Sequence, residues 1–254
     1  MFIETFDEAI KWRRVHRKKL KDGIKRQLRA KSTLANCRRN HRCETEACRV
    51  CMRDFRLWWT GEAVKIILQR PNWTRCSVIT EGLLIKPGQL SSFDLAGAVK
   101  RIRKRLERSL IHDRIVLGGL DVSLNLESNK MSGWQFHLYM LIEGKNSDNL
   151  QAAVKKAFPP EPTALAAYDF EEVTDPLKAI TYTYKALIQR RSEYINRDGN
   201  HETANQPLKG ADLRELLPFL SRHEVGARLI LCGVRRNGQR LVFTPKKPTA
   251  TPQT

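Results

Sequence analysis

The sequence predicts an α+β fold: one antiparallel sheet with helices packed on one face, preceded by a basic helical region that contains a zinc knuckle. Three observations predict this arrangement. Strand-like segments with alternating apolar and polar residues are interleaved with helical segments between residues 73 and 190. Four of the six cysteines fall within fifteen positions of each other, ahead of those segments. The chain has 46 Lys and Arg against 27 Asp and Glu, a formal charge of +19.

Composition narrows the class of protein before any motif is considered. The 254 residues are 41% hydrophobic, enough to bury a core. A charge of +19 attracts a polyanion before specific contacts form. No apolar run approaches the roughly 20 residues that span a bilayer, and the acidic N-terminal segment is unlike a signal peptide. We therefore expect a cytoplasmic protein that binds nucleic acid and no membrane.

The first predicted element is a basic helix over residues 5–31. Between Lys11 and Lys31 it carries eleven Lys or Arg and a single acid, Asp22. Like charges at this density repel one another unless phosphates neutralise them, although a plain solvated helix face would also read this way. The DNA-binding candidates here are Arg13, Arg14, Arg17, Lys18 and Lys19.

The cysteine cluster follows, with the pattern Cys37-x₅-Cys43-x₄-Cys48-x₂-Cys51. Thiolates at short spacing can close a tetrahedral zinc site, and His41 is a spare ligand. Four unrelated buried thiols are the alternative, but the stretch has few apolar neighbours. Further DNA-binding candidates within the cluster are Arg38, Arg39 and Arg42.

The central elements alternate between helix and strand. We expect a helix over 52–70, a strand over 73–80, an amphipathic helix over 93–110, and strands over 120–126 and 134–142 joined as a hairpin. If the hairpin loop centres near Asn129, Asp121 lies opposite His137 and the polar faces of the two strands coincide.

The later elements are a helix over 146–157, a strand over 166–173 and a helix over 176–191 that starts at Asp175-Pro176. A polar loop over 194–210, a helix near 211–223 and a hairpin across Asn237-Gly238 complete the order. The expected divisions are 1–70 for the basic zinc-knuckle region, 71–195 for a central domain that holds the candidate catalytic residues described below, 196–243 for a helix and hairpin extension, and 244–254 for a disordered tail. The arginines of the last hairpin suit either a DNA-contacting wing or a charged sheet edge.

Two tyrosines in the helix over 176–191 have different surroundings. Tyr184 shares a stripe with Ile180 and Leu187, so we expect it in the core. Tyr182 lies three residues from Lys185 on another stripe. A nearby ammonium assists a phenol, whose pKa is otherwise near 10, to act as a nucleophile. Tyr182 and Lys185 are therefore the catalytic candidates, against the alternative of an ordinary surface tyrosine.

The strand over 134–142 places Gln135, His137 and Tyr139 on one face. Imidazole and carboxylate together suit Mn²⁺ or Mg²⁺ when phosphate oxygens and waters complete the shell. The metal candidates are His137, Asp121, Tyr139 and Gln135.

These segments resemble the HUH endonuclease domain of rolling-circle replication initiator (Rep) proteins. The metal strand of that family commonly reads Gly-Trp-His-Pro-His-Leu-His, and residues 133–139 read Gly-Trp-Gln-Phe-His-Leu-Tyr. His137 matches the first paired histidine, and Tyr139 stands in place of the second. Residues 180–185, Ile-Thr-Tyr-Thr-Tyr-Lys, match the tyrosine motif of the family.

The resemblance implies a ferredoxin-like palm and tyrosine attack on a scissile phosphate polarised by Mg²⁺ or Mn²⁺, while the cysteine spacing predicts a structural zinc in the knuckle. It implies as partners the DNA of an origin or mobile-element end, single-stranded or hairpin, together with a host helicase, in a bacterial cytoplasm. The alternative function is a non-catalytic, zinc-dependent DNA-binding regulator derived from a degenerate Rep.

Overall fold

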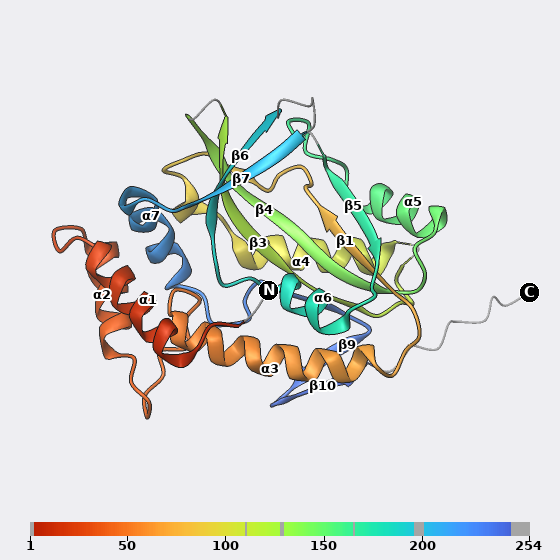
Figure 1. Ribbon diagram of the computed structural model, residues 1–254, viewed down its shortest axis with the longest axis horizontal. Coiled ribbons are helices and arrows are strands. Elements are labelled where there is room, and N and C mark those ends of the chain that lie inside the picture. Colours follow the sequence, from red (N-terminus) through yellow and green to blue (C-terminus); the bar gives the residue numbers. More distant parts are fainter. Residues whose placement is uncertain (1–2, 110, 128–129, 165, 196–200, 245–254) are drawn as a thin grey trace, which may run out of the picture.

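The computed structural model describes residues 3–109, 111–127, 130–164, 166–195 and 201–244, and the fold is α+β (Figure 1). Within these ranges seven α-helices surround a mixed, mostly antiparallel sheet of eight strands. The disordered tail predicted over 244–254 lies outside the described residues except for Thr244. A helical N-terminal region carries the four clustered cysteines, as the sequence predicts.

The sheet has the order β5-β1-β4-β3-β6-β7, with β2 on β4 and β8 on β3. The long central pair, β3 and β4, forms the predicted hairpin, and β6 alone runs parallel to its neighbour β3. The strands are β1 Trp73–Val78, β2 Leu84–Ile85, β3 Val116–Glu127, β4 Lys130–Glu143, β5 Tyr168–Glu172, β6 Gln189–Ile195, β7 His201–Pro207 and β8 Leu229–Cys232.

The predicted helix over 5–31 is two helices, α1 Phe6–Lys19 and α2 Lys25–Asn36. The chain turns at Leu20, whose backbone is extended. Its buried side chain packs at the turn between the two helices and does not belong to the apolar face of one continuous helix. The side chains of Thr5 and Glu8 cap the start of α1 reciprocally. The long helix α3 Arg49–Ile67 begins three residues earlier than predicted, inside the cysteine cluster.

One face of the sheet is covered by α4 Leu95–Arg108, whose buried stripe includes Val99, Ile102 and Leu106. These residues share a core with Phe136 and Leu138 of β4. Helices α5 Asp148–Ala157 and α7 Gly210–Leu220 add buried side chains to the same core. The amphipathic pattern over 93–110 therefore predicts the position of α4 correctly.

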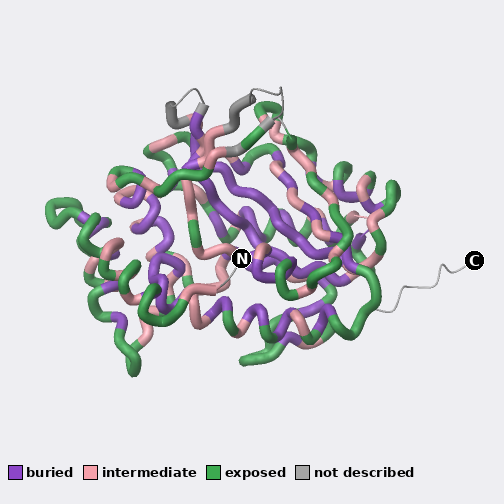
Figure 2. Tube along the Cα trace, viewed as in Figure 1, coloured by how far each residue is buried: buried purple, intermediate pink, exposed green. Residues whose placement is uncertain are grey.

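The opposite face also carries helices, which corrects the expectation that all helices pack on one face. Trp59 of α3 and Ile180 of α6, Pro176–Thr183, share a second core with Leu117 of β3 and Leu141 of β4. The reason is local: this face is apolar at the Leu117 and Leu141 end and polar further along. Figure 2 shows the strands as the largest continuous buried region, between exposed helix surfaces.

Two further elements differ from the prediction. Helix α6 ends at Thr183, because Tyr184 leaves the helical backbone region, and the chain then enters β6. The polar stretch predicted as a loop over 194–210 pairs with β6 as β7. Strand pairing with β3 outweighs the weak apolar pattern of residues 187–191. The hairpin across Asn237-Gly238 is confirmed, as β9 Val234–Asn237 and β10 Arg240–Phe243.

Candidate functional site

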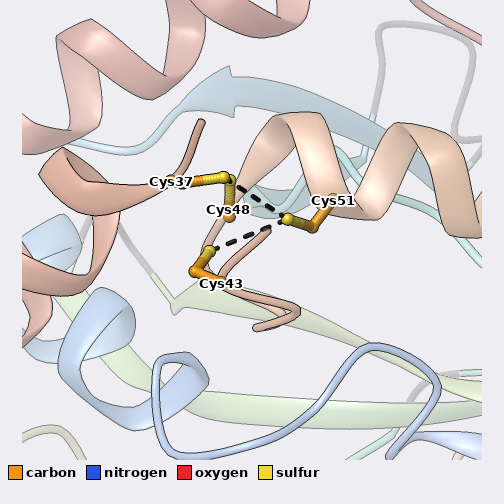
Figure 3. A group of neighbouring side chains, drawn as sticks. All are labelled: Cys37, Cys43, Cys48 and Cys51. Carbon is orange, nitrogen blue, oxygen red and sulfur yellow. Dashed lines mark hydrogen bonds between the residues drawn. The ribbon is translucent and has the colours of Figure 1, made fainter. Parts of the chain in front are cut away.

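The four clustered cysteines converge on one point (Figure 3). Cys37 Sγ lies 3.6 Å from the sulfurs of both Cys48 and Cys51, and Cys43 Sγ lies 3.7 Å from Cys51 Sγ. All four sulfurs lie within 4.8 Å of one another. Zn–S bonds of about 2.3 Å place the sulfurs of a tetrahedral site about 3.8 Å apart. The predicted cluster therefore has the geometry to hold a zinc ion.

Local structure explains how the sulfurs meet. Cys37 ends α2, and a tight turn between Arg38 and His41 then reverses the chain toward Cys43. Cys48 precedes the first residue of α3 and Cys51 lies in its first turn. Hydrogen bonds with the Cys48 and Cys51 thiols lower the pKa of Cys43, and a lower pKa favours the thiolate, the form of cysteine that binds metal. The spare candidate His41 is exposed and is not part of the group.

The basic residues around this region divide into two groups. Arg13 donates to the Cys37 carbonyl oxygen at 2.5 Å, and Arg42 pairs with Asp54 at 2.9 Å. Both side chains therefore stabilise contacts within the protein. The other six predicted DNA contacts are exposed and have no ion pair within the described part of the chain. They are Arg14, Arg17, Lys18, Lys19, Arg38 and Arg39.

The second site is the polar part of the sheet face opposite α4. Asp121 of β3 pairs directly with His137 of β4, as the hairpin register predicts, and Ser123 pairs with Gln135. His137 Nε2 lies 2.9 Å from Ser123 Oγ and 3.4 Å from Arg191 Nη1. Burial, with the positive charges of Arg191 and Lys185, lowers the pKa of His137 to about 3. The imidazole is therefore neutral.

Lys185 lies at the centre of this polar cluster, although it follows the end of α6. Its Nζ is 3.6 Å from Asp121 Oδ2, 3.6 Å from the ring centre of Tyr182 and 4.4 Å from that of Tyr139. The other Asp121 oxygen, Oδ1, is buried and has no hydrogen-bond partner within the described residues. The cluster therefore offers one free carboxylate oxygen beside an ammonium and a neutral imidazole.

The two tyrosines of the motif occupy the different environments that the helical pattern predicts. Tyr184 is 2% exposed, and its hydroxyl donates to Glu46. Tyr182 is half-buried, and its ring meets that of Tyr139 edge-on at 5.0 Å. Burial by itself raises the pKa of Tyr182, but the Lys185 charge and hydrogen bonds with Lys185 and Tyr139 outweigh it and lower the pKa overall.

The remaining metal candidates suit an ion less well. Burial and the negative charge of Asp121 raise the pKa of Tyr139, so its phenol stays neutral. The Gln135 amide nitrogen donates to the Phe136 carbonyl oxygen at 3.0 Å. Asp121 and His137 are the two predicted ligands whose atoms suit a divalent ion.

Sequence reasoning missed two arginines at this cluster. Arg191 of β6 reaches His137, but the sequence predicts a helix for this segment, and a helix would point the side chain elsewhere. Arg75 of β1 lies 5.7 Å from the Tyr182 ring centre and pairs with Asp169 at 3.0 Å and with Glu171. The alternation of side chains along the predicted strand could have indicated which face of the sheet Arg75 lies on.

Basic residues also gather away from both sites. On the outer surface of α4, Lys100, Arg101, Lys104 and Arg108 are exposed and have no ion pair within the described ranges. The C-terminal hairpin packs on α3, where Trp58 Nε1 donates to the Gln239 carbonyl oxygen at 2.8 Å. That packing leaves Arg235 and Arg240 exposed.

Comparison with protein-family models, curated proteins and solved structures finds no match to this chain. No helix in the described ranges is long and apolar enough to cross a bilayer.

Proposed function

We propose that this chain cuts and rejoins one strand of DNA at a specific site through a tyrosine nucleophile, in the manner of a rolling-circle replication initiator with an HUH palm. One observation carries the proposal: the Lys185 ammonium lies between the Tyr182 ring and Asp121, opposite His137. Tyr182 and Lys185 reach this point from a helix and from the segment after it. This convergence supports a reaction centre more strongly than the spacing of the two residues alone.

The proposed reaction is a phosphoryl transfer. The Tyr182 phenol gives up its proton to water, its oxygen forms a bond to the phosphorus, and the bond from phosphorus to the 3′-oxygen breaks. The products are a 5′-phosphotyrosine and, after the leaving oxygen takes up a proton, a free 3′-hydroxyl that can prime synthesis. The positive charges of Lys185 and Arg191 stabilise the charge that develops on the phosphate oxygens. Reversal of the same steps rejoins the strand.

A divalent ion is part of the proposal. Mg²⁺ is commonly held by one or two protein ligands, with substrate phosphates and waters completing its shell. The unpartnered Asp121 Oδ1 and the neutral His137 would hold Mg²⁺ or Mn²⁺ in this way. The bound ion would polarise the scissile phosphate. The zinc at the cysteines is structural in this proposal and takes no part in the reaction.

DNA is the proposed partner, at an origin or mobile-element end. Six exposed basic residues on α1 and the turn after α2 would contact phosphates without reading bases. The outer surface of α4, which covers the sheet face opposite the polar cluster, adds four more exposed basic residues.

A second candidate function is a zinc-dependent DNA-binding regulator that does not cut. The buried, neutral phenol of Tyr139, which stands where the family has a second imidazole, favours this reading. Lys185 beside Asp121 also weakens the attraction of that carboxylate for a divalent ion.

Adduct formation on Tyr182 distinguishes the two functions. The protein is incubated with a random-sequence pool of single-stranded and hairpin oligonucleotides in Mn²⁺, and covalent complexes are isolated under denaturing conditions. We expect nucleotide on the Tyr182 peptide by mass spectrometry, with none from Tyr182→Phe and with nucleotide still on Tyr182 in Tyr184→Phe. Nucleotide on Tyr184 would keep the reaction class but reassign the nucleophile. No adduct on either tyrosine, with DNA binding retained, would leave the regulator.

A further inference from the structure

Glu46 and Arg228 form a completely buried ion pair between distant parts of the chain. Their side chains are 0% and 1% exposed, and Arg228 Nη2 lies 2.9 Å from Glu46 Oε2. Burying two charges is costly and seldom adds net stability over apolar residues of similar size. The bonds that this pair makes to its surroundings indicate what it contributes.

The Arg228 guanidinium connects two segments of the polar cluster. Its Nη1 donates to the carbonyl oxygen of Leu120, the residue before Asp121, at 2.8 Å. Its Nη2 donates to the carbonyl oxygen of Lys185 at 3.4 Å. Arg228 therefore ties the backbone of Lys185 to β3 at Leu120, next to Asp121.

Glu46 supplies the counter-charge and a third connection. Its Oε1 accepts hydrogen bonds from the Tyr184 hydroxyl and from the Gly226 backbone N–H, the latter at 3.1 Å. Tyr184 lies between Tyr182 and Lys185 in the chain, so Glu46 anchors the segment that carries both candidate catalytic residues.

Glu46 itself belongs to the cysteine knuckle. Glu46 lies between Cys43 and Cys48, and its backbone N–H donates to the His223 carbonyl oxygen at 2.9 Å. Arg49, next to Cys48, donates to the carbonyl oxygen of Ala186. Residues of the knuckle therefore contact the segment from Tyr184 to Ala186 at two points.

We propose, on the basis of the function proposed above, that Glu46 and Arg228 are positioning residues. They hold the segment from Tyr184 to Ala186 against β3, so that the Lys185 ammonium stays between Asp121 and Tyr182. The knuckle then has a defined role as the anchor of the reaction centre, in addition to any contact with DNA.

The test replaces the pair by apolar residues, Glu46→Met with Arg228→Met. Because such replacements of buried pairs are often neutral for stability, we expect a thermal midpoint close to that of the parent. We expect faster amide hydrogen exchange in residues 184–187 without DNA. Adduct formation at saturating DNA should slow by roughly 10- to 100-fold, with unchanged DNA affinity, since small displacements of reacting groups have effects of this size.

Arg56→Met is the matched control. Arg56 pairs with Glu4 at 2.7 Å, with side-chain exposures of 4% and 10%, and none of its hydrogen bonds or ion pairs reaches residues 184–186. It should lower the thermal midpoint while leaving exchange in 184–187 and the adduct rate as in the parent. Equal loss of exchange protection in 184–187 from this control would overturn the proposal.

Other outcomes also decide the matter. A folded double variant with parental exchange in 184–187 would show that the pair positions nothing. If the double variant does not fold, Arg228→Lys applies the same criterion, because an ammonium cannot span the Leu120 and Lys185 carbonyls as the guanidinium does. If the parent forms no adduct, the proposed function fails, whereas hydrogen exchange still decides whether the pair orders the segment.

Discussion

The Lys185 ammonium lies 3.6 Å from Asp121 Oδ2, although α6 ends at Thr183 and Asp121 lies in the middle of β3. The contact brings the tyrosine segment to the polar face of the sheet, where His137 pairs with Asp121. Burial alone lowers the pKa of Lys185, but the negative charge of Asp121 and interactions with both tyrosines raise it overall, so Lys185 stays charged.

The cysteine cluster should bind one zinc ion. Metal analysis of the purified protein should find one equivalent, and Cys48→Ser with Cys51→Ser should lose it, because two of four thiolates are removed. The N-terminal helices should then lose stability, since α2 ends at the ligand Cys37 and α3 begins after the ligand Cys48. Cys232→Ser, outside the cluster, is the control and should retain the metal. Zinc retained by the double variant would refute the ligand assignment.

The exposed basic side chains of α1 should contribute most of the salt dependence of DNA binding. Replacing Arg14, Arg17, Lys18 and Lys19 with Ala should reduce the slope of log affinity against log salt by roughly one unit per lost contact. The control replaces four exposed lysines elsewhere and changes net charge equally: Lys86, Lys145, Lys155 and Lys156. Equal slopes for the two quadruple variants would mean that only net charge matters.

His137→Ala and Asp121→Ala should abolish adduct formation and leave duplex binding nearly intact, because both side chains are buried on the sheet face and neither is one of the exposed basic residues proposed to contact DNA. Fluorescence anisotropy with duplex DNA measures the binding, and adduct yield in Mn²⁺ measures the chemistry. If adduct yield is unchanged in both variants, the divalent ion is not held there.

Tyr139→His should strengthen Mn²⁺ binding, because an imidazole is a better ligand than a neutral phenol. Tyr139 stacks on His137 with 6.1 Å between ring centres, so the new ring would stand beside the existing one. Calorimetric titration with Mn²⁺ compares the variant with the parent. Weaker binding by the variant would show that the strand is misaligned with the family motif.

Lys185→Ala should slow adduct formation without eliminating it, since Lys185 stabilises charge and forms no bond to phosphorus.

Tyr184→Phe should unfold at a lower urea concentration than the parent. Its free energy of unfolding should fall by about 1.5–3 kcal/mol, because the change removes a hydrogen bond to a buried carboxylate. Tyr182→Phe is its control and should match the parent in stability. A Tyr182→Phe protein as unstable as Tyr184→Phe would remove the distinction between the two tyrosines.

The Asp121–His137 register and the burial of α4 could both be predicted from the sequence, because periodic burial leaves a periodic pattern. The convergence of the cysteines could be predicted from their spacing for a similar reason, since short links limit how far the sulfurs can separate. The end of α6 could not be predicted. The apolar spacing of Ile180, Leu187 and Ile188 suits a continuing helix, and only the pairing of β6 with β3 makes the chain a strand from Gln189 onward.

The sequence by itself determined which residues could do chemistry here: four thiols at metal-ligand spacing, an acid and a histidine at matching hairpin positions, and a tyrosine with a lysine nearby. Tertiary structure alone decided that Arg191 meets His137 and that Arg228 is a buried partner of Glu46 in place of a surface charge. The physical reason is that a charge can be buried only where distant segments supply its partners, and Glu46 and Arg228 are 182 positions apart. A pairing between residues so far apart leaves no repeating apolar or polar pattern in the sequence, so it cannot be predicted from the sequence alone.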